Sequence, residues 1–270
     1  MDLIPLSLRL VLYVGGVLVV GSVALRLTLP VVAASRFDGV LTRQLWIGAG
    51  ALLVAALGLT LQFLLVIAGG DLALALSPDF LAIGAQTPVG QANALRVVAV
   101  LALGATLVLG LRQAAAVPAA ALLLSFALEG HSLSYGSRLL TSGLLLLHLV
   151  IVSWWLAVLM PLLGAETEQR DKLGHAFGRQ AIVAVPVLLV AGGLLLVQFT
   201  GWTIDLSLDY HRRMILKLFA VGGILALAAA NKLYFTGKKT GFVWALRAET
   251  AVALTILALT ALLTSTGPDM

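Results

Sequence analysis

The feature that most constrains this chain is a series of eight apolar runs, each about 20 residues long. An α-helix needs about 20 apolar residues to cross the ~30 Å hydrocarbon core of a bilayer, so each run is long enough to span a membrane. Hydrophobic residues make up 61% of the chain and charged residues 11%, whereas soluble domains carry about 25% charged residues. The sequence therefore predicts an all-α, polytopic membrane protein. We expect one transmembrane domain over residues 1–270, a bundle of eight helices near 6–29, 45–68, 93–111, 117–135, 139–163, 178–200, 211–235 and 243–265.

The lysines and arginines predict the orientation of these helices. An outer N-terminus puts 11 of the 17 basic residues on the cytoplasmic side and leaves six, Arg96 among them, on the outer side. Because basic residues accumulate in cytoplasmic loops, this bias favours a chain with both termini outside. It also leaves His175 in a cytoplasmic loop. The net charge of +5 is then explained by topology in a membrane lipid environment, and no nucleic-acid partner is expected.

Residues 126–155 place three ionisable side chains inside otherwise apolar runs: Glu129, His131 and His148. Such a group costs a few kcal/mol within a membrane span, so each of the three is a candidate functional residue. The ordinary alternative for the two histidines is an interhelical hydrogen bond. The run 135–138, Tyr-Gly-Ser-Arg, predicts a tight turn, so the two histidines are expected on antiparallel neighbouring helices at different depths.

The histidines and methionines are the main candidates for metal binding. The chain contains no cysteine, which leaves imidazole, thioether, carboxylate or backbone oxygen as ligands. His211 and Met214 are three residues apart and share a helix face, and a soft thioether suits Cu(I); the alternative for Met214 is packing. We expect these two residues to join His131 and His148 in one metal locus open to the outer side, if their helices meet. Trp155, on the His148 stripe, packs in the core or lines a cation path with its ring face.

Two polar residues mark the cytoplasmic side of the last two runs. Asn231 lies near the end of the seventh run and Glu249 near the start of the eighth. Two interpretations remain open. The pair forms the inner exit of a transport path, or it forms a structural hydrogen bond between the last two helices.

The outer connection 69–92 is long for a helical bundle. It carries Asp71 and Asp79 but no lysine or arginine, and residues 71–84 predict a short interfacial helix. It serves either as a lid or docking surface, or as a loop that rests on lipid headgroups.

An ordered set of elements resembles the copper-resistance protein D (CopD) family of bacterial inner-membrane proteins. The elements are FALEGHS, LLLLHLVIVSWWLAVLMPLL, a sixth run rich in AGG, YHRRMILKLFAVGGILALAAANK and a later RAET. The resemblance is best over residues 120–265, while the first four runs resemble the family mainly in their number. It implies eight spans, both termini periplasmic, and a role in copper uptake or homeostasis, often beside a periplasmic copper carrier of the CopC type.

Carried over residue by residue, the resemblance covers positions from the fourth run to the last. These positions are His131, His148, Trp155, Tyr210, Lys217, Asn231 and Glu249. The chain departs from the family in two places. Tyr210-His211-Arg212 stands where the family has Tyr-Gly-Arg, so His211 is either an added ligand or a neutral substitution, and Asn231-Lys232 replaces Asn-Arg.

These observations predict a copper-handling protein that moves copper from periplasm to cytoplasm. No nucleotide-binding loop of the Walker type is present, and we expect no enzymatic activity. One alternative is a membrane cytochrome with haem b between two histidines, because two imidazoles on facing helices are what a bis-histidine haem needs. Another is a membrane docking partner for a periplasmic copper carrier.

Overall fold

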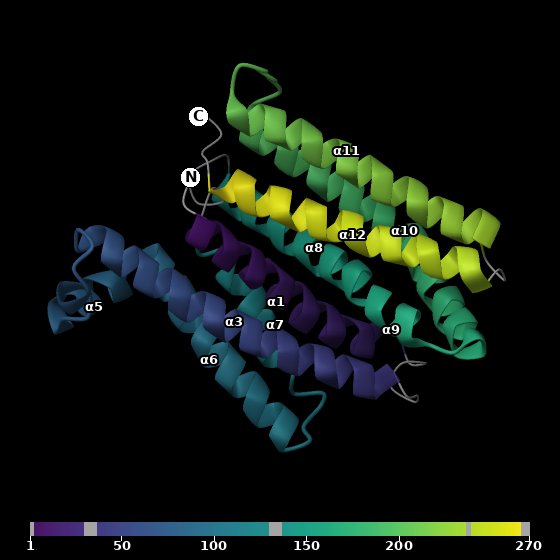
Figure 1. Cartoon of the computed structure of the whole chain (residues 1–270), viewed down its shortest axis with the longest axis horizontal. Coiled ribbons are helices and arrows are strands. Elements are labelled where there is room, and N and C mark those ends of the chain that lie inside the picture. The colour runs from purple at the N-terminus through teal and green to yellow at the C-terminus, as the bar shows by residue number, and fades with distance from the viewer. Residues whose placement is uncertain (1–2, 30–36, 130–136, 236–238, 266–270) are drawn as a thin grey trace.

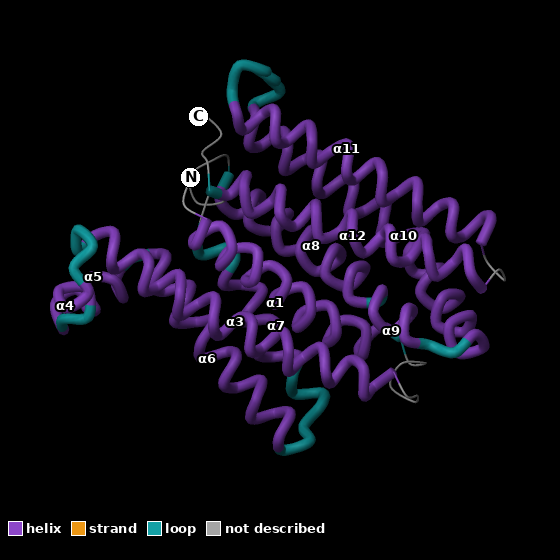
Figure 2. The backbone as a smooth tube through the Cα atoms, viewed as in Figure 1, coloured by secondary structure: helices purple, strands orange, loops and turns teal. Residues whose placement is uncertain are grey.

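The computed structural model describes residues 3–29, 37–129, 137–235 and 239–265, and these residues form helices joined by turns and loops (Figure 2). Within these ranges no β-strand is present. The prediction of an all-α protein is therefore confirmed.

Seven helices in the described ranges are long and apolar enough to cross a membrane. They are α1 (Leu3–Thr28), α3 (Phe37–Ile67), α6 (Pro88–Val108), α8 (Arg138–Ala157) with its continuation α9 (Leu159–Gly164), α10 (Thr167–Thr200), α11 (Asp209–Ala230) and α12 (Lys239–Thr264). The shorter elements are α4 (Leu72–Ala75), α5 (Pro78–Gln86), α7 (Ala116–Ser125) and the π-helix η2 (Asn231–Phe235). The chain is thus a multi-pass membrane protein.

The fourth predicted span, 117–135, differs from the structure. The helix found there, α7, has 10 residues, so it is about 15 Å long and covers about half of a hydrocarbon core. Residues 126–129 continue as turns and bends, and residues 130–136 lie outside the described ranges. At the eight positions predicted for long helices, the described chain therefore has long helices at seven and the short helix α7 at the other.

The sixth predicted span also begins earlier than expected. α10 starts at Thr167, so His175 lies on the exposed face of a helix and not in a loop. This first part of α10 is held by the fully buried side chain of Leu173. An ion pair four residues apart, between Glu168 and Lys172, supports the same turns.

α1 lies at the centre of the bundle, between α3 on one side and α8 on the other (Figure 1). Glycines permit both contacts. A Cβ atom on Gly15 would lie 2.9 Å from the carbonyl oxygen of Gly48, and one on Gly21 would lie 2.1 Å from the carbonyl oxygen of Ser153. Small residues of this kind let membrane helices approach closely.

Two clusters of buried apolar side chains lie on the two sides of α1. The first joins α1, α3, α6 and α7 and includes Leu12, Leu45, Leu103 and Leu122. The second surrounds α8 and α9 and includes Trp154, Trp155, Leu188, Ile224 and Leu246. α11 contributes only Ile224 to the buried part of this cluster and packs mainly against α12. The bundle therefore has an N-terminal and a C-terminal half that share α1.

The start of α1 and the end of α12 lie at the same end of the bundle (Figure 1). Arg9 Nη1 donates to the carbonyl oxygen of Thr264 at 2.6 Å, and the hydroxyl of Tyr13 hydrogen-bonds the hydroxyl of Thr264 at 2.8 Å. α11 begins at this end as well, since Arg213 Nη1 donates to the carbonyl oxygen of Leu262 at 3.5 Å.

The connection between α3 and α6 forms two short helices, α4 and α5, where the sequence predicted one short helix over residues 71–84. The carboxylate of Asp71 caps α4 by accepting the backbone N–H groups of Ala73 and Leu74 at 2.8 and 3.1 Å. α5 packs on α6 and α3. Several apolar side chains of this segment are exposed: Leu72, Leu74, Leu76, Leu81 and Ile83.

Candidate functional site

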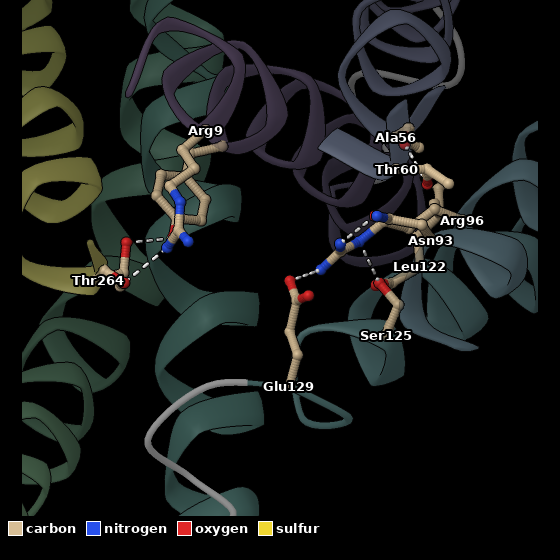
Figure 3. A network of polar contacts seen from close by, with 10 residues as sticks. Arg9, Ala56, Thr60, Asn93, Arg96, Leu122, Ser125, Glu129 and Thr264 are labelled. Atoms are coloured by element: carbon tan, nitrogen blue, oxygen red, sulfur yellow. Dashed lines mark hydrogen bonds and ion pairs between the residues drawn. The ribbon is translucent and has the colours of Figure 1, made fainter. Parts of the chain in front are cut away.

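A buried polar cluster surrounds Arg96 on α6 in the N-terminal half (Figure 3). The side chain of Arg96 is fully buried. Its Nε donates to Ser125 Oγ at 3.1 Å, its Nη1 to Asn93 Oδ1 at 2.7 Å, and its Nη2 to the carboxylate of Glu129 at 2.5 Å. The guanidinium also lies over the ring of Phe126, 5.0 Å from the centroid. Glu129, predicted as a candidate because a charge is costly in lipid, therefore has a charged partner.

Arg96 itself was missed by the sequence analysis, which counted it among the outer basic residues. Ser125 and Glu129 lie 29 and 33 residues further along the chain, so no local pattern predicts these contacts. A partial signal was available. Asn93 and Arg96 are three residues apart in an apolar run, and this spacing places an amide and a guanidinium on one helix face.

His148 lies half-buried on α8 and faces α10. A Cβ atom on Gly192 would lie 3.3 Å from both Cε1 and Nδ1 of the His148 ring. The ring also lies beside the backbone of Leu188, one turn away on α10, and Lys217 of α11 acts on it electrostatically. Nδ1 is buried and has no hydrogen-bond partner in the described part of the chain. An unsatisfied buried group costs about 1–3 kcal/mol, so this nitrogen is a candidate for binding a ligand.

His211 is buried at the start of α11, where it closes the loop that joins α10 to α11. Its Nδ1 lies 2.9 Å from the backbone nitrogen and 3.1 Å from the backbone oxygen of Asp205. Either tautomer is therefore satisfied. When Nδ1 donates to the carbonyl oxygen, Nε2 is left as the basic nitrogen, which is the arrangement typical of a metal-binding histidine.

The loop before α11 also carries a shifted carboxyl group. The hydroxyl and the backbone N–H of Ser207 stabilise the carboxylate of Asp205 and hold its pKa below the ordinary value. Asp205 is therefore negatively charged at neutral pH and lies beside the ring of His211.

His211 and Met214 line one small pocket, here called the His211 pocket, as their spacing predicted. The lining residues are Leu196, Thr200, Ile204, His211, Met214, Ile215 and Leu218. Tyr210 is buried beside it, with its ring edge toward His211 and a centroid distance of 5.9 Å.

One stripe of α10 joins this pocket to His148. Gly192 contacts the His148 ring, while Leu196 and Thr200 line the His211 pocket. These three residues are spaced by four, so they lie on one face of α10, and each step along the helix is about 6 Å. The pocket therefore lies above His148, nearer the end of the bundle where α11 begins.

The structure places His148 at one level of the bundle and the pair His211 and Met214 at another. α8 packs against α1 and α10, whereas α11 packs mainly against α12. No group of three histidine, aspartate or glutamate residues suited to a metal occurs among the described residues. His131 lies outside the described ranges. Trp155 is 7% exposed and belongs to the hydrophobic cluster around α8, so its packing favours the core interpretation.

Asn231 and Glu249 are in direct contact near the other end of the bundle. Both side chains are buried, and Asn231 Nδ2 donates to Oε1 of Glu249. Asn231 also begins the π-helix η2, directly after α11. The two residues therefore join the last two helices at the end opposite the His211 pocket.

A comparison with protein families identifies the N-terminal half. The model of the copper resistance protein D-like N-terminal domain matches residues 1–138. The chain belongs to the copper resistance protein D-like family. The resemblance noted in the sequence is thus confirmed at the level of the family, but the match covers α1 to α7 and the Arg96 cluster, where the resemblance was expected to be weak. No curated protein and no solved structure matches the chain.

Proposed function

We propose that this protein is a copper permease of the bacterial inner membrane, which moves copper from the periplasm to the cytoplasm without enzymatic turnover. Its membership of the copper resistance protein D-like family and its seven membrane-spanning helices support this role. A periplasmic copper carrier of the CopC type delivers the ion to the outer face in this scheme. The exposed apolar segment around α4 and α5 rests in the outer lipid interface.

The proposed topology has eight crossings with both termini in the periplasm. It is supported by the contacts of Arg9 and Tyr13 with Thr264, because a chain that starts and ends at one end of a bundle crosses it an even number of times. The described helices include seven long ones. In this scheme α7, with the turns and bends at residues 126–129, provides the remaining crossing.

The observation that carries the proposed path is the half-buried His148, whose buried Nδ1 lies against Gly192 without a hydrogen-bond partner among the described residues. An imidazole nitrogen and a thioether both bind copper well. In our scheme the ion first contacts His211 and Met214 and then moves down the α10 stripe to His148. Isolated ligands at successive levels suit transport, because an ion that is conducted must also leave each site.

The experiment measures copper accumulation by cells and copper bound to the purified protein for wild type and His148→Ala. Since even a supporting residue of a metal site contributes about 10–100-fold in affinity, we expect both quantities to fall by about tenfold or more. His175→Ala is the matched control, because His175 is an exposed histidine on α10, and it should behave as wild type. Equal copper values for His148→Ala and wild type contradict the path.

The same purified protein separates this function from the haem b alternative. A haem held by two histidines gives a visible Soret band, whereas the copper permease has no such band. A Soret band that disappears in His148→Ala identifies the protein as a cytochrome.

A further inference from the structure

Glu249 on α12 is a buried carboxyl group whose hydrogen-bond partner is an amide and not a basic side chain. It is 4% exposed. Its polar contact is the hydrogen bond from Asn231 Nδ2, and no salt bridge to it occurs among the described residues. Glu249 is also set about 15 Å into α12, counted from Lys239 at 1.5 Å per residue.

The charged groups of the elements packed on α12 are engaged elsewhere or lie far away. On α1, Arg9 and Tyr13 bind Thr264 at the opposite end of α12, and Arg26 pairs with Asp38 at 2.8 Å. α9 has no titratable residue.

Among the residues whose side chains the structure describes, the remaining basic residues near this end do not pair with the carboxyl group either. On α11, the nearest basic residue before Asn231 is Lys217, about 20 Å away along the helix. Lys232 of η2 is exposed. On α12 itself, the exposed Arg247 lies over Trp244 at 5.6 Å. On α10, Arg170 donates to two backbone carbonyl groups and lies over Phe242 at 5.9 Å.

Burial without a counter-charge favours the neutral form of a carboxyl group. An isolated ionised carboxylate is so costly in an apolar medium that the group takes up a proton instead, and ionisable residues within membrane helices often form proton relays. The amide of Asn231 can donate to either protonation state, because both states keep an acceptor oxygen. The π-helix that begins at Asn231 is a local geometry found frequently at functional sites.

We propose that Glu249, held by Asn231, is a proton-binding site that exchanges its proton with the cytoplasmic side. A single carboxylate is a hard ligand and a poor site for a soft copper ion, so the proton is its expected occupant. A coupling of this proton to copper movement rests on the proposed copper transport. The proton site itself does not depend on that proposal.

The test treats the full-length protein in proteoliposomes with dicyclohexylcarbodiimide, which attacks protonated carboxyl groups in apolar surroundings. The labelled glutamate is located by mass spectrometry. We expect labelling at Glu249, and a decrease of about tenfold for each pH unit above its midpoint, since the reagent needs the protonated acid. Glu129 is the internal control within the chain, because it forms an ion pair with Arg96, and it should remain unlabelled.

A spectroscopic measurement covers the case in which the reagent does not reach the site. Infrared spectra should show the carbonyl stretch of a protonated carboxyl group in wild type, and this band should be absent from Glu249→Gln. Asn231→Ala should extend labelling and the band to higher pH, because the carboxylate loses its hydrogen-bond donor; a purely structural contact predicts no such shift. Absence of both label and band at every pH overturns the proposal.

The two proposals fail in different ways. His148→Ala should label like wild type, because His148 belongs to the copper path and not to the proton site. If Glu249→Gln removes label and band but transports copper at the wild-type rate and pH dependence, the proton site stands and its coupling to copper is refuted. If wild type shows the band but no copper transport, the permease function is refuted alone.

Discussion

The half-buried Glu129 and the buried Glu249 show how differently the two halves of this bundle treat charge. Glu129, in the half matched by the family model, is bound by Arg96, which also bonds Asn93 and Ser125. Glu249, in the C-terminal half, has an amide as its hydrogen-bond partner. The N-terminal half uses a buried charge pair to join α6 with the residues after α7. In the C-terminal half, Glu249 and His148 have no ion-pair partner among the described residues. Ionisable groups of this kind can exchange protons or bind cations.

The largest expected effect comes from removing the charge that compensates Glu129. Breaking a buried ion pair by deleting one partner costs about 3–5 kcal/mol. The carboxylate left here, Glu129, is 25% exposed, so the loss lies at the low end of that range. We therefore expect Arg96→Ala to lower the free energy of unfolding by about this amount, measured by denaturant titration in detergent micelles with tryptophan fluorescence. The double variant Arg96→Ala, Glu129→Gln is the control and should recover part of the loss. A loss below about 1 kcal/mol contradicts the structural role of the pair and with it the contrast between the halves.

The sequence predicts the long helices well and the polar contacts poorly, for physical reasons. A run of about 20 apolar residues suffices to predict a membrane helix, and six of the eight predicted runs overlap long single helices here, with a seventh shared by α8 and α9. α7 is different, because its apolar run is interrupted after Ser125 where the chain turns toward Glu129. No sequence pattern distinguishes that interruption from a longer helix.

The candidate residues show the same limit. The cost of a charge in lipid was enough to single out Glu129 and His148, and a position near the inner boundary to single out Glu249. Neither criterion tells which of these residues has a partner. Partnership depends on contacts made from far along the chain, such as Arg96 with Glu129 and His148 with Gly192. His211 with Met214, three residues apart on one helix, was predictable because it is local.

A smaller effect is expected where α10 approaches His148. The added Cβ of Gly192→Ala lies 3.3 Å from two atoms of the His148 ring, so the ring must move by a few tenths of an ångström. Alanine also favours the helix over glycine by about 1 kcal/mol, which offsets part of the crowding. We expect a stability change of about 1 kcal/mol or less, and copper accumulation between that of wild type and that of His148→Ala.

Gly193→Ala is the matched control for this substitution. It makes the same change one residue away, where nothing lies within 4 Å of the new Cβ. It should therefore gain the helix preference and leave copper accumulation at the wild-type level. If cells with the two alanine variants accumulate equal amounts of copper, then Gly192 does not make room for a functional His148 ring.

The smallest expected effect is that of Glu249→Gln on stability. Its size tests directly whether Glu249 and Glu129 differ in charge. If Glu249 carries a proton, glutamine keeps the carbonyl oxygen that accepts from Asn231 Nδ2 and introduces no change of charge. The free energy of unfolding should then change by less than about 1 kcal/mol. Glu129→Gln keeps an acceptor for Arg96 Nη2 but removes the negative charge that compensates the buried guanidinium, and it should cost about 1.5–3 kcal/mol. Both values come from the same denaturant titration at neutral pH. Equal losses for the two variants mean that Glu249 is ionised and stabilised by a cation, so that both halves of the bundle compensate their buried charges alike.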